Sequence, residues 1–280
     1  MPVPNSLSSH RPLTLISASE LRSMLSRGDL FFKYRAFNEA TKPHIRDVLI
    51  GNRVYFARRS SFNDPFDSCV RPVYEGTEDE WRDRYAGVLA RRCPELSEEQ
   101  RLKMVRDMIR NQRFKSIPDW VGRDFPERAG IFCLSKRYDH LLMWSHYAES
   151  HTGLCIAFSE DNAFFGSAQP ITYVKAYPDI SYLHSSQDVL TTAMLLTKAD
   201  VWEYEEEWRI IEHKGGPGIY TFPPESLVAV ILGCKMPAQN KDLVQQWCSE
   251  RRPRPRIFQA CMSERQFALD FKEITSIAQV

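Results

Sequence analysis

The chain has 280 residues, of which 43% are hydrophobic and 26% charged, a composition typical of a globular protein with a sizeable core. Its 37 basic and 36 acidic residues give a net charge of +1, which argues against a dedicated non-specific nucleic-acid binder but leaves local nucleic-acid contacts open. No apolar run approaches the roughly 18 residues of a membrane span, and the seven cysteines form no CxxC pair. We therefore expect a cytoplasmic protein with reduced thiols and no membrane partner.

The N-terminal part of the chain predicts a leader followed by three short elements. Residues 1–14 are rich in Ser and Pro, and we expect a flexible leader there. A short helix should follow it. The alternation of aromatic and polar residues over 31–37 predicts a strand, and residues 39–50 fit a helix with Ile45, Val48 and Leu49 facing inward.

The next block, VYFARRSSFNDPFD at 54–67, predicts a strand followed by a turn at Asn63, Asp64 and Pro65. Asp64 and Asp67 are candidate metal ligands, but the turn chemistry explains their placement equally well. No spacing in the chain supplies the further oxygen or imidazole ligands that a metal would need. We therefore predict no metal site.

Charged residues in a helical pattern fill the stretch from Asp79 to Asn111, where Trp81 and Tyr85 recur at helical spacing. This stretch contains no tight group of catalytic residue types. We predict a helical insertion at about 79–128, between the second and third strands, that covers one face of a sheet.

Scarce, chemically active residue types are concentrated between 131 and 158. Strand signals at 131–134 and 154–158 flank a helical segment that Gly153 ends. Successive helical residues point about 100° apart, so the Trp, Ser, His and Tyr of 144–147 cannot all face the core. At least one polar member must reach a cavity or solvent, and His146 is a candidate base, ligand or structural residue.

Residues 202–211, WEYEEEWRII, carry the densest acidic run. In an extended conformation, Glu203, Glu205 and Glu207 would line one strand face together with Arg209. Three like charges at intervals of about 7 Å raise the pKa of at least one carboxyl group or require a cation. The alternative is a solvated edge strand in which Arg209 screens the glutamates.

Strand and helix signals alternate irregularly along the chain, without the rhythm of a doubly wound fold. We predict a single α+β domain over residues 15–280, built on a mixed, mostly antiparallel sheet. Its C-terminal part should contain a strand at 228–233, a helix at 241–250 and an irregular tail from Phe267. The basic run RRPRPR at 251–256 cannot be helical; we expect a solvated loop, with phosphate or nucleic-acid contact as the alternative.

Four blocks of the chain together resemble a known family. They are FKYR at 32–35, VYFARRSSFNDPFD at 54–67, LMWSHYAESHTGLCIAF at 142–158 and WEYEEEWR at 202–209. In this order and spacing they resemble the bacterial domain-of-unknown-function family 2971, over roughly residues 31–236. FNDPFD and MWSHYA are unusual strings, which makes the combined resemblance specific. The family itself implies no activity.

A second resemblance concerns chemistry. An arginine on an early strand, a serine at a strand end and a Glu-x-Glu entering a later strand are similar to the arginine, serine and glutamate motifs of ADP-ribosyltransferases. The resemblance implies that Arg35 clamps the NAD diphosphate and that Ser135, or the pair Ser60–Ser61, orders the site. It implies that Glu207 stabilises the oxocarbenium ion as nicotinamide leaves, with Glu205 orienting the acceptor. The chain lacks the Ser-Thr-Ser triplet of those enzymes.

These motifs together predict one cleft. Its expected catalytic residues are Glu207, Glu205, His146 and Arg209, and its expected cofactor-binding residues are Arg35, Ser135, Ser61, Asn63, Asp64, Trp144 and Tyr147. We expect an NAD-consuming enzyme of the ADP-ribosyl-transferring type, in a bacterial toxin or phage-defence setting. NAD would be the substrate and small-molecule nucleotide partner, and the acceptor stays open.

Two other functions compete with this one. A metal-dependent nuclease would use Asp64, Asp67, Glu207 and His146 and would lose activity to a chelator. A non-enzymatic nucleotide- or protein-binding module would use Trp144 and Tyr147 as stacking platforms and would turn over neither NAD nor nucleic acid.

Overall fold

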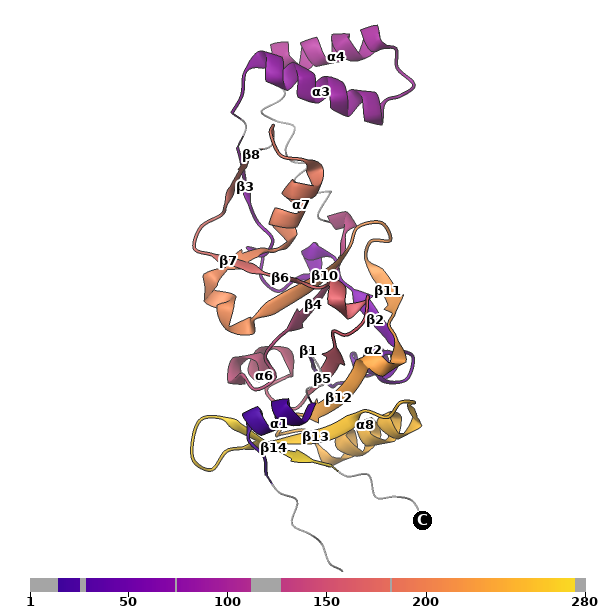
Figure 1. Ribbon diagram of the computed structural model, residues 1–280, viewed down its shortest axis with the longest axis vertical. Coiled ribbons are helices and arrows are strands. Elements are labelled where there is room, and N and C mark those ends of the chain that lie inside the picture. The colour runs from indigo at the N-terminus through magenta and orange to yellow at the C-terminus, as the bar shows by residue number, and fades with distance from the viewer. Residues whose placement is uncertain (1–14, 26–28, 74, 112–126, 182, 275–280) are drawn as a thin grey trace, which may run out of the picture. The chain divides into compact units, whose positions relative to one another are not determined.

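The computed structural model describes most of the chain (Figure 1). The described residues are 15–25, 29–73, 75–111, 127–181 and 183–274. The predicted leader at 1–14 and the 112–126 part of the predicted insertion lie outside these residues. Among the described residues, no helix is long and apolar enough to cross a membrane.

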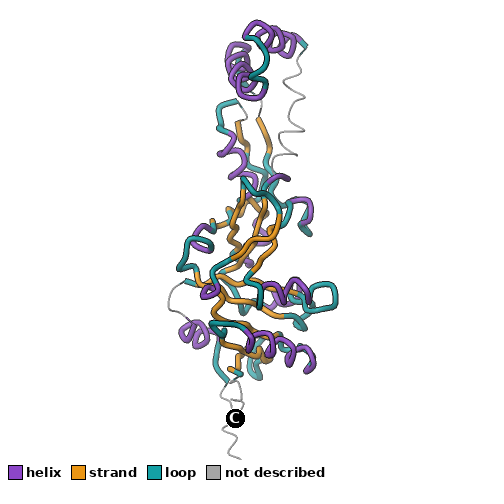
Figure 2. Tube along the Cα trace, turned by 90° about the vertical axis from the view of Figure 1, so that its right-hand side faces the viewer, coloured by secondary structure: helices purple, strands orange, loops and turns teal. Residues whose placement is uncertain are grey.

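The chain forms two compact units. The first unit comprises residues 1–54, 134–167 and 221–280, and the second comprises 55–133 and 168–220. Both units contain helices and strands, which Figure 2 distinguishes by colour along the chain. Three strands have residues in both units, namely β2 (Arg53–Phe56), β4 (Gly130–Ser135) and β11 (Gly218–Thr221).

The first unit is built on strands in the order β14-β13-β12-β5-β1. Its strands are β1 (Leu30–Arg35), β5 (Leu154–Ser159), β12 (Leu227–Leu232), β13 (Arg256–Met262) and β14 (Leu269–Glu273). Its helices are α1 (Ala18–Leu25), α2 (Lys42–Leu49), α6 (Leu141–Tyr147) and α8 (Ala238–Glu250), with short 3₁₀ turns η3 (Phe165–Ser167) and η5 (Pro224–Ser226). All neighbouring strands are antiparallel except the parallel pair β12 and β13.

Strand β5 is an interior strand of this sheet, because it pairs with β1 on one side and β12 on the other. Its residues from Leu154 to Phe158 are all buried, as the continuous apolar run of a strand covered on both faces requires. The glycine before it is required by close packing, since a Cβ at Gly153 would lie 2.1 Å from the Arg35 carbonyl oxygen. The predicted strand, helix and strand over 131–158 are confirmed as β4, α6 and β5.

The C-terminal part of the first unit differs from the prediction. The tail from Phe267 is not irregular, because β14 pairs antiparallel with β13. The basic run is not wholly a solvated loop, because Arg251 is buried and donates to the carbonyl oxygens of Leu49 and Pro224. Burial of this guanidinium without a described carboxylate partner lowers the pKa of Arg251.

The second unit contains mostly shorter strands. They are β3 (Arg71–Val73), β6 (Gln169–Pro170), β7 (Thr172–Val174), β8 (Asp179–Ser181), β9 (Thr197–Ala199) and β10 (Glu207–Glu212). Its helical segments are η1 (Arg59–Ser61), α3 (Glu78–Arg92), α4 (Glu98–Arg110), α7 (Gln187–Leu195) and η4 (Asp200–Glu205). Strand β6 pairs antiparallel with β10, whereas β3 with β8 and β7 with β9 are parallel pairs.

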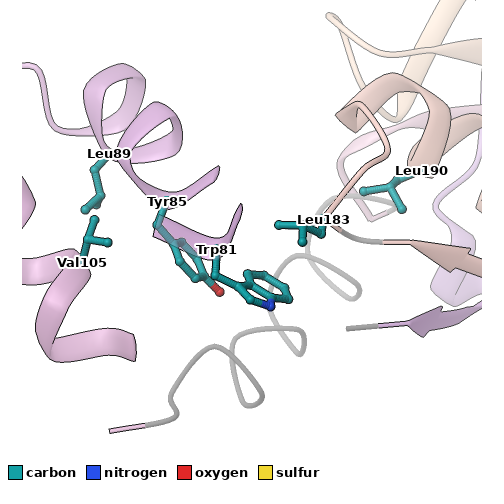
Figure 3. Packing of buried hydrophobic residues seen from close by; sticks show 6 residues of the cluster. All are labelled: Trp81, Tyr85, Leu89, Val105, Leu183 and Leu190. Carbon is teal, nitrogen blue, oxygen red and sulfur yellow. The ribbon is translucent and has the colours of Figure 1, made fainter. Parts of the chain in front are cut away.

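The described part of the predicted insertion is a hairpin of α3 and α4. Each helix begins with a capping box, in which Thr77 pairs with Glu80 and Ser97 with Gln100. Trp81 and neighbours at helical spacing form an apolar stripe on α3, which packs with residues of α4, α7 and the segment before α7 (Figure 3). The buried members of this cluster are Trp81, Tyr85, Leu89, Val105, Leu183 and Leu190. The α+β class, the mixed, mostly antiparallel sheet and the presence of a helical insertion are therefore confirmed. The insertion follows β3 and not the second strand, and its role as a cover over one face of a sheet stays a prediction.

Candidate functional site

The loop after η1 is shaped by its own side chains. Asp64 Oδ1 accepts a hydrogen bond from the backbone N–H of Phe66 at 2.8 Å, which is the turn chemistry expected of Asn-Asp-Pro. Ser68 then adopts the left-handed conformation, with φ of 57°, and its N–H donates to the Thr197 carbonyl oxygen of β9. The side chains of Asp67 and Ser68 are thereby directed into the interior of the second unit, where both are buried.

The acidic segment is not one continuous strand, contrary to the prediction. Residues Asp200–Glu205 form the 3₁₀ helix η4, Glu206 is left-handed with φ of 42°, and β10 begins at Glu207. Three residues complete a 3₁₀ turn, so Trp202 and Glu205 share one face of η4.

Glu205 and Glu207 are consequently both buried, whereas Glu203 and Glu206 are exposed. The expected row of three glutamates on one strand face was wrong, because the backbone reverses at Glu206. The expected placement of Glu207 and Arg209 on one face is confirmed, since both are buried two residues apart on β10.

Five charged side chains meet inside the second unit, and we call them the buried charge network. They belong to Asp67, Lys198, Glu205, Glu207 and Arg209, and none of these residues is more than 5% exposed. Arg209 Nε donates to Glu207 Oε1 at 2.7 Å, and its Nη2 donates to both oxygens of Asp67 at 2.9 and 2.7 Å. Its Nη1 donates to the Leu195 carbonyl oxygen and to Ser68 Oγ.

Lys198 joins the carboxylates from β9. Its Nζ lies 2.5 Å from Glu205 Oε2, 2.8 Å from Glu207 Oε2 and 3.6 Å from Asp67 Oδ2. The Tyr173 hydroxyl accepts a hydrogen bond from the Glu207 N–H at 2.7 Å, which fixes the start of β10. The network therefore joins β9, β10 and the loop at 62–68 into one arrangement.

Ion pairing overrides the cost of burial in this network. Burial raises the pKa of Glu207, but Arg209 and Lys198 together lower it by a larger amount. The net pKa of Glu207 therefore lies well below its usual range. Burial lowers the pKa of Lys198, whereas Glu207 and Glu205 raise it well above its usual value. Burial also lowers the pKa of Arg209, but neighbouring groups, Glu207 foremost, raise it by a larger amount, so the net pKa is raised. All three groups are therefore charged at neutral pH.

The network leaves Glu207 little capacity for chemistry. Both of its oxygens accept hydrogen bonds from protein cations, and the side chain is buried. A general base or a cation-stabilising carboxylate must lie within hydrogen-bond reach of the substrate. The described geometry therefore gives Glu207 a structural role, and its catalytic role stays a prediction.

Exposed side chains lie on the loop at 62–68 and on η4. Trp202 Nε1 donates to Asp64 Oδ2 at 2.8 Å, which ties η4 to the loop at 62–68. Tyr177 lies within electrostatic range of the same loop, because burial, then Cys69 and then Asp64 raise the pKa of its hydroxyl. We call this region the Asp64 surface. Its most exposed apolar side chains are Phe66 at 63%, Tyr177 at 48% and Val201 at 72%.

Two predicted binding residues of the first unit lie in its interior. Trp144 is fully buried; its Nε1 donates to the Tyr138 carbonyl oxygen at 2.8 Å, and its ring meets Tyr34 edge-on. A side chain with no exposed surface offers no face to a stacking base. Ser135 is also buried, and its Oγ accepts from the Arg137 N–H at 2.8 Å, closing the turn after β4.

The remaining predicted residues of the first unit are more accessible. His146 is exposed on α6, which confirms that a polar member of the 144–147 group reaches solvent. Tyr147 is partly buried beside it, with the two rings edge-on. Arg35 is partly buried at the end of β1.

The other predicted residues lie in the second unit with Glu205, Glu207 and Arg209. Ser61 Oγ donates to the Arg58 carbonyl oxygen at 2.7 Å, so it closes the η1 turn. Asn63 is exposed and Asp64 is partly buried in the loop that follows. The second unit thus brings Asp64, Glu205, Glu207 and Arg209 into one region. The convergence of these residues with Arg35 and His146 stays a prediction.

Lys198 and Ser68 are members of this region that the sequence patterns did not identify. A signal for Lys198 exists in the sequence, because LLTKAD places one lysine between an apolar helix end and the acidic run. A buried acidic cluster needs a cation of this kind. Ser68 carries no such signal, because its role follows from a left-handed backbone.

The described residues contain no group of three His, Cys, Asp or Glu side chains arranged to hold a metal ion. In the buried charge network, Lys198 and Arg209 occupy the space between the carboxylates that a metal would need. The residues proposed for a metal-dependent nuclease thus lack a described ligand set.

Comparison with known proteins gives one match. No curated protein and no solved structure matches the chain significantly. A family model matches residues 143–210. This segment contains the MWSHYA and WEYEEEWR blocks but neither FKYR nor FNDPFD, so it is shorter than the span of the family resemblance expected from the sequence. The match does not support the likeness to ADP-ribosyltransferases. Residues 143–210, which include most of α6 and the Lys198 to Arg209 part of the network, are thus similar to the family described as a protein of unknown function, DUF2971.

Proposed function

We propose that the chain is a non-enzymatic protein-binding module that uses the Asp64 surface. The observation that carries this proposal is the exposure of Phe66, Tyr177 and Val201 around a loop that the buried charge network fixes. Exposed aromatic and aliphatic side chains gathered in one region are typical of protein interaction sites. The acidic run then has a structural purpose, because it anchors this surface.

The charges of this surface indicate the chemistry of the partner. Glu203 and Glu206 are exposed on and beside η4, and Asp64 and Asp200 are partly buried close by. Opposite charge on a partner raises the association rate and selects the register of binding. We infer a partner segment that combines basic side chains with at least one large apolar side chain.

Rigidity of the surface supports the same proposal. Asp67 is held at one end of the 62–68 loop by Arg209, and Trp202 is held to Asp64 at the other. Binding to side chains that are already ordered costs less conformational entropy than binding to a mobile loop. The network therefore contributes to affinity without touching the partner.

Fluorescence anisotropy with short labelled peptides tests the proposal. The probes combine Arg or Lys with Leu or Phe, and the control probes carry Glu in place of the basic residues. We expect the basic probes to bind more tightly and to lose affinity as salt is added. Phe66→Ser should weaken binding by about tenfold or more, the effect of removing an anchor side chain.

Ile219→Ser is the matched control, because Ile219 is 59% exposed on β11 of the same unit and lies outside the Asp64 surface as defined here. Its affinity should equal that of the unmodified chain. Equal binding of acidic and basic probes, or equal losses for Phe66→Ser and Ile219→Ser, would refute the proposed surface.

A second function, ADP-ribosyl transfer from NAD, is favoured by one observation. The Glu-x-Glu residues Glu205 and Glu207 share Lys198, and the network among the described residues contains three carboxylates and two cations. The excess negative charge would stabilise a developing oxocarbenium ion nearby. Release of nicotinamide by the purified protein tests this function.

In the NAD case, Glu207→Gln should reduce nicotinamide release by about 10² or more while the protein stays folded. In the binding-module case, nicotinamide is not released by either protein, and Glu207→Gln lowers stability instead. The two functions therefore predict different outcomes for one variant.

A further inference from the structure

Helix α4 of the second unit carries a row of basic side chains. Lys103, Arg106 and Arg110 follow one another at intervals of three and four residues, so they lie on one face of the helix, and all three are exposed. Val105 lies on a different face and is fully buried in the cluster that α4 forms with α3 (Figure 3). The packing of α4 on α3 therefore leaves the basic row in solvent.

Two apolar side chains flank this row. Leu102 is 38% exposed and Met104 is 42% exposed. Residues 101–110 include one acidic residue, Asp107, and four basic ones, namely Arg101, Lys103, Arg106 and Arg110. Within the described part of the chain, the three residues of the basic row form no ion pair. Helix α4 thus combines basic with large apolar side chains, which is the chemistry inferred for the partner of the Asp64 surface.

The Asp64 surface carries an acidic row of the opposite sign. Asp200 and Glu203 are three residues apart on η4, and three residues complete a 3₁₀ turn, so they lie on one edge of it. Glu206 directly follows η4 and is exposed, and Val201 beside the row is 72% exposed. Neither Asp200 nor Glu203 forms an ion pair with a described residue. The row therefore offers carboxylates to a partner.

The two rows agree in spacing. A 3₁₀ helix rises about 2 Å per residue, which places Asp200 and Glu203 about 6 Å apart along its axis. An α-helix rises about 1.5 Å per residue, so Lys103, Arg106 and Arg110 follow at intervals of about 4.5 and 6 Å. Two helices lying side by side can therefore set opposite charges against each other, with an apolar side chain of α4 next to Val201.

The rows do not cover each other within one chain. Lys103 and Arg106 are exposed on α4, and Glu203 and Val201 are exposed on η4 of the same chain. A second copy brings both rows to the encounter. The net charge of +1 means that repulsion between whole chains hardly opposes their association.

We propose that the partner of the Asp64 surface is a second copy of this chain, whose α4 docks its basic row on η4. This inference rests on the proposed function, because it names the occupant of the same surface. Each chain has both rows, so two chains can form a closed pair with two equivalent contacts, or they can associate head to tail. The same pairing of rows holds either assembly together.

Sedimentation velocity of the full chain over a wide range of protein concentration tests the proposal. We expect the mean sedimentation coefficient to rise with concentration and to fall as salt is added. The double variant Lys103→Glu/Arg106→Glu sets acid against acid, so its association constant should fall by about tenfold or more. Asp200→Lys/Glu203→Lys should have the same effect. The variant that combines all four substitutions restores opposite charges and should regain association.

Arg46→Glu/Lys235→Glu is the matched control, because it changes the net charge by the same amount at two exposed residues of the first unit. This variant should associate like the unmodified chain, and circular dichroism should show the same fold for every variant. A chain that stays monomeric at all concentrations overturns the proposal, as does a combined variant that associates no better than either double variant. Loss of binding to RNA or to anionic vesicles by Lys103→Glu/Arg106→Glu, with a monomeric native chain, assigns α4 to another partner and overturns it too.

The peptide titration of the Asp64 surface separates this inference from the proposed function. If basic peptides bind that surface while the native chain stays monomeric, the proposed function stands and a second copy is not the occupant. If acidic and basic peptides bind equally and the chain is monomeric, both proposals fail. Charge-dependent association together with preferential binding of basic peptides supports both.

Discussion

The interior of the second unit and the central strands of the first unit are equally inaccessible to solvent, but the former contains charged side chains and the latter apolar ones. In the first unit, β5 and β12 place apolar side chains such as Ile156 and Ile231 at 1% exposure or less. In the second unit, Arg209 is equally inaccessible but is surrounded by Asp67, Glu207 and Lys198. Apolar burial is non-directional, whereas buried charge is stable only when each group keeps its partners. The two regions should therefore respond differently to small changes.

The largest expected effect is that of Arg209→Met. Methionine fills a similar volume, but Asp67 and Glu207 lose their main partner, and Lys198 alone faces three carboxylates. Removal of one member of a buried ion-pair group costs roughly 3–5 kcal/mol of unfolding free energy. Urea unfolding measures this cost. A change below about 1 kcal/mol would mean that the network does not stabilise the second unit.

A smaller loss is expected from Glu207→Gln. The amide keeps the shape of the side chain, but it has one acceptor oxygen in place of the two that Lys198 and Arg209 use. Hydrogen bonds to charged groups contribute roughly 1.5–3 kcal/mol, which sets the expected decrease. Glu203→Gln is the matched control, because Glu203 is exposed on η4, and it should change stability by less than about 0.5 kcal/mol. Equal losses for the two variants would contradict the assigned role of Glu207.

The pH dependence of stability should carry the signature of the same carboxylate. The pKa of Glu207 is lowered in the folded chain, so the unfolded chain takes up the proton first as the pH falls. Its contribution is fully present above the unfolded pKa of about 4.3 and is lost progressively below it. The difference in Tm between the unmodified chain and Glu207→Gln should therefore shrink from neutral pH to about pH 3. A constant difference in Tm over this range would contradict the ion-paired role assigned to Glu207.

The smallest expected effect belongs to the apolar region. Ile156→Val removes one buried methyl group from the middle of β5 without disturbing a polar partner. Such substitutions cost about 0.5–1.5 kcal/mol, which urea unfolding can resolve. A loss as large as that of Arg209→Met would remove the contrast between the two regions.

Local patterns predicted the elements whose residues bury themselves without help from distant segments. The spacing of Ile45, Val48 and Leu49 predicted α2, and all three are buried on it. The apolar run at 154–158 predicted β5 for the same reason. The strand β14 was missed, because its five residues alternate apolar and polar character too briefly to distinguish an edge strand from a tail.

The candidate site was likewise predicted only in part from the sequence. The sequence identified Glu205, Glu207 and Arg209 as an unusual concentration of charge, and it identified Asp67 as a candidate ligand. It did not predict that η4 ends in a left-handed residue, because Glu206 is not a residue type that favours this conformation. That single backbone reversal decides which glutamates are buried.

Residue order alone determined the α+β class, the turn at Asn63 to Pro65, the helical character of the insertion and the presence of an acidic run, because each depends on neighbours a few positions apart. Only the tertiary structure decided the partners of that run. Arg209 and Asp67 are 142 positions apart in the chain, and Lys198 reaches the carboxylates from a different strand. Ion pairs form through space, so a charge pattern shows that partners are needed without showing which ones the fold supplies.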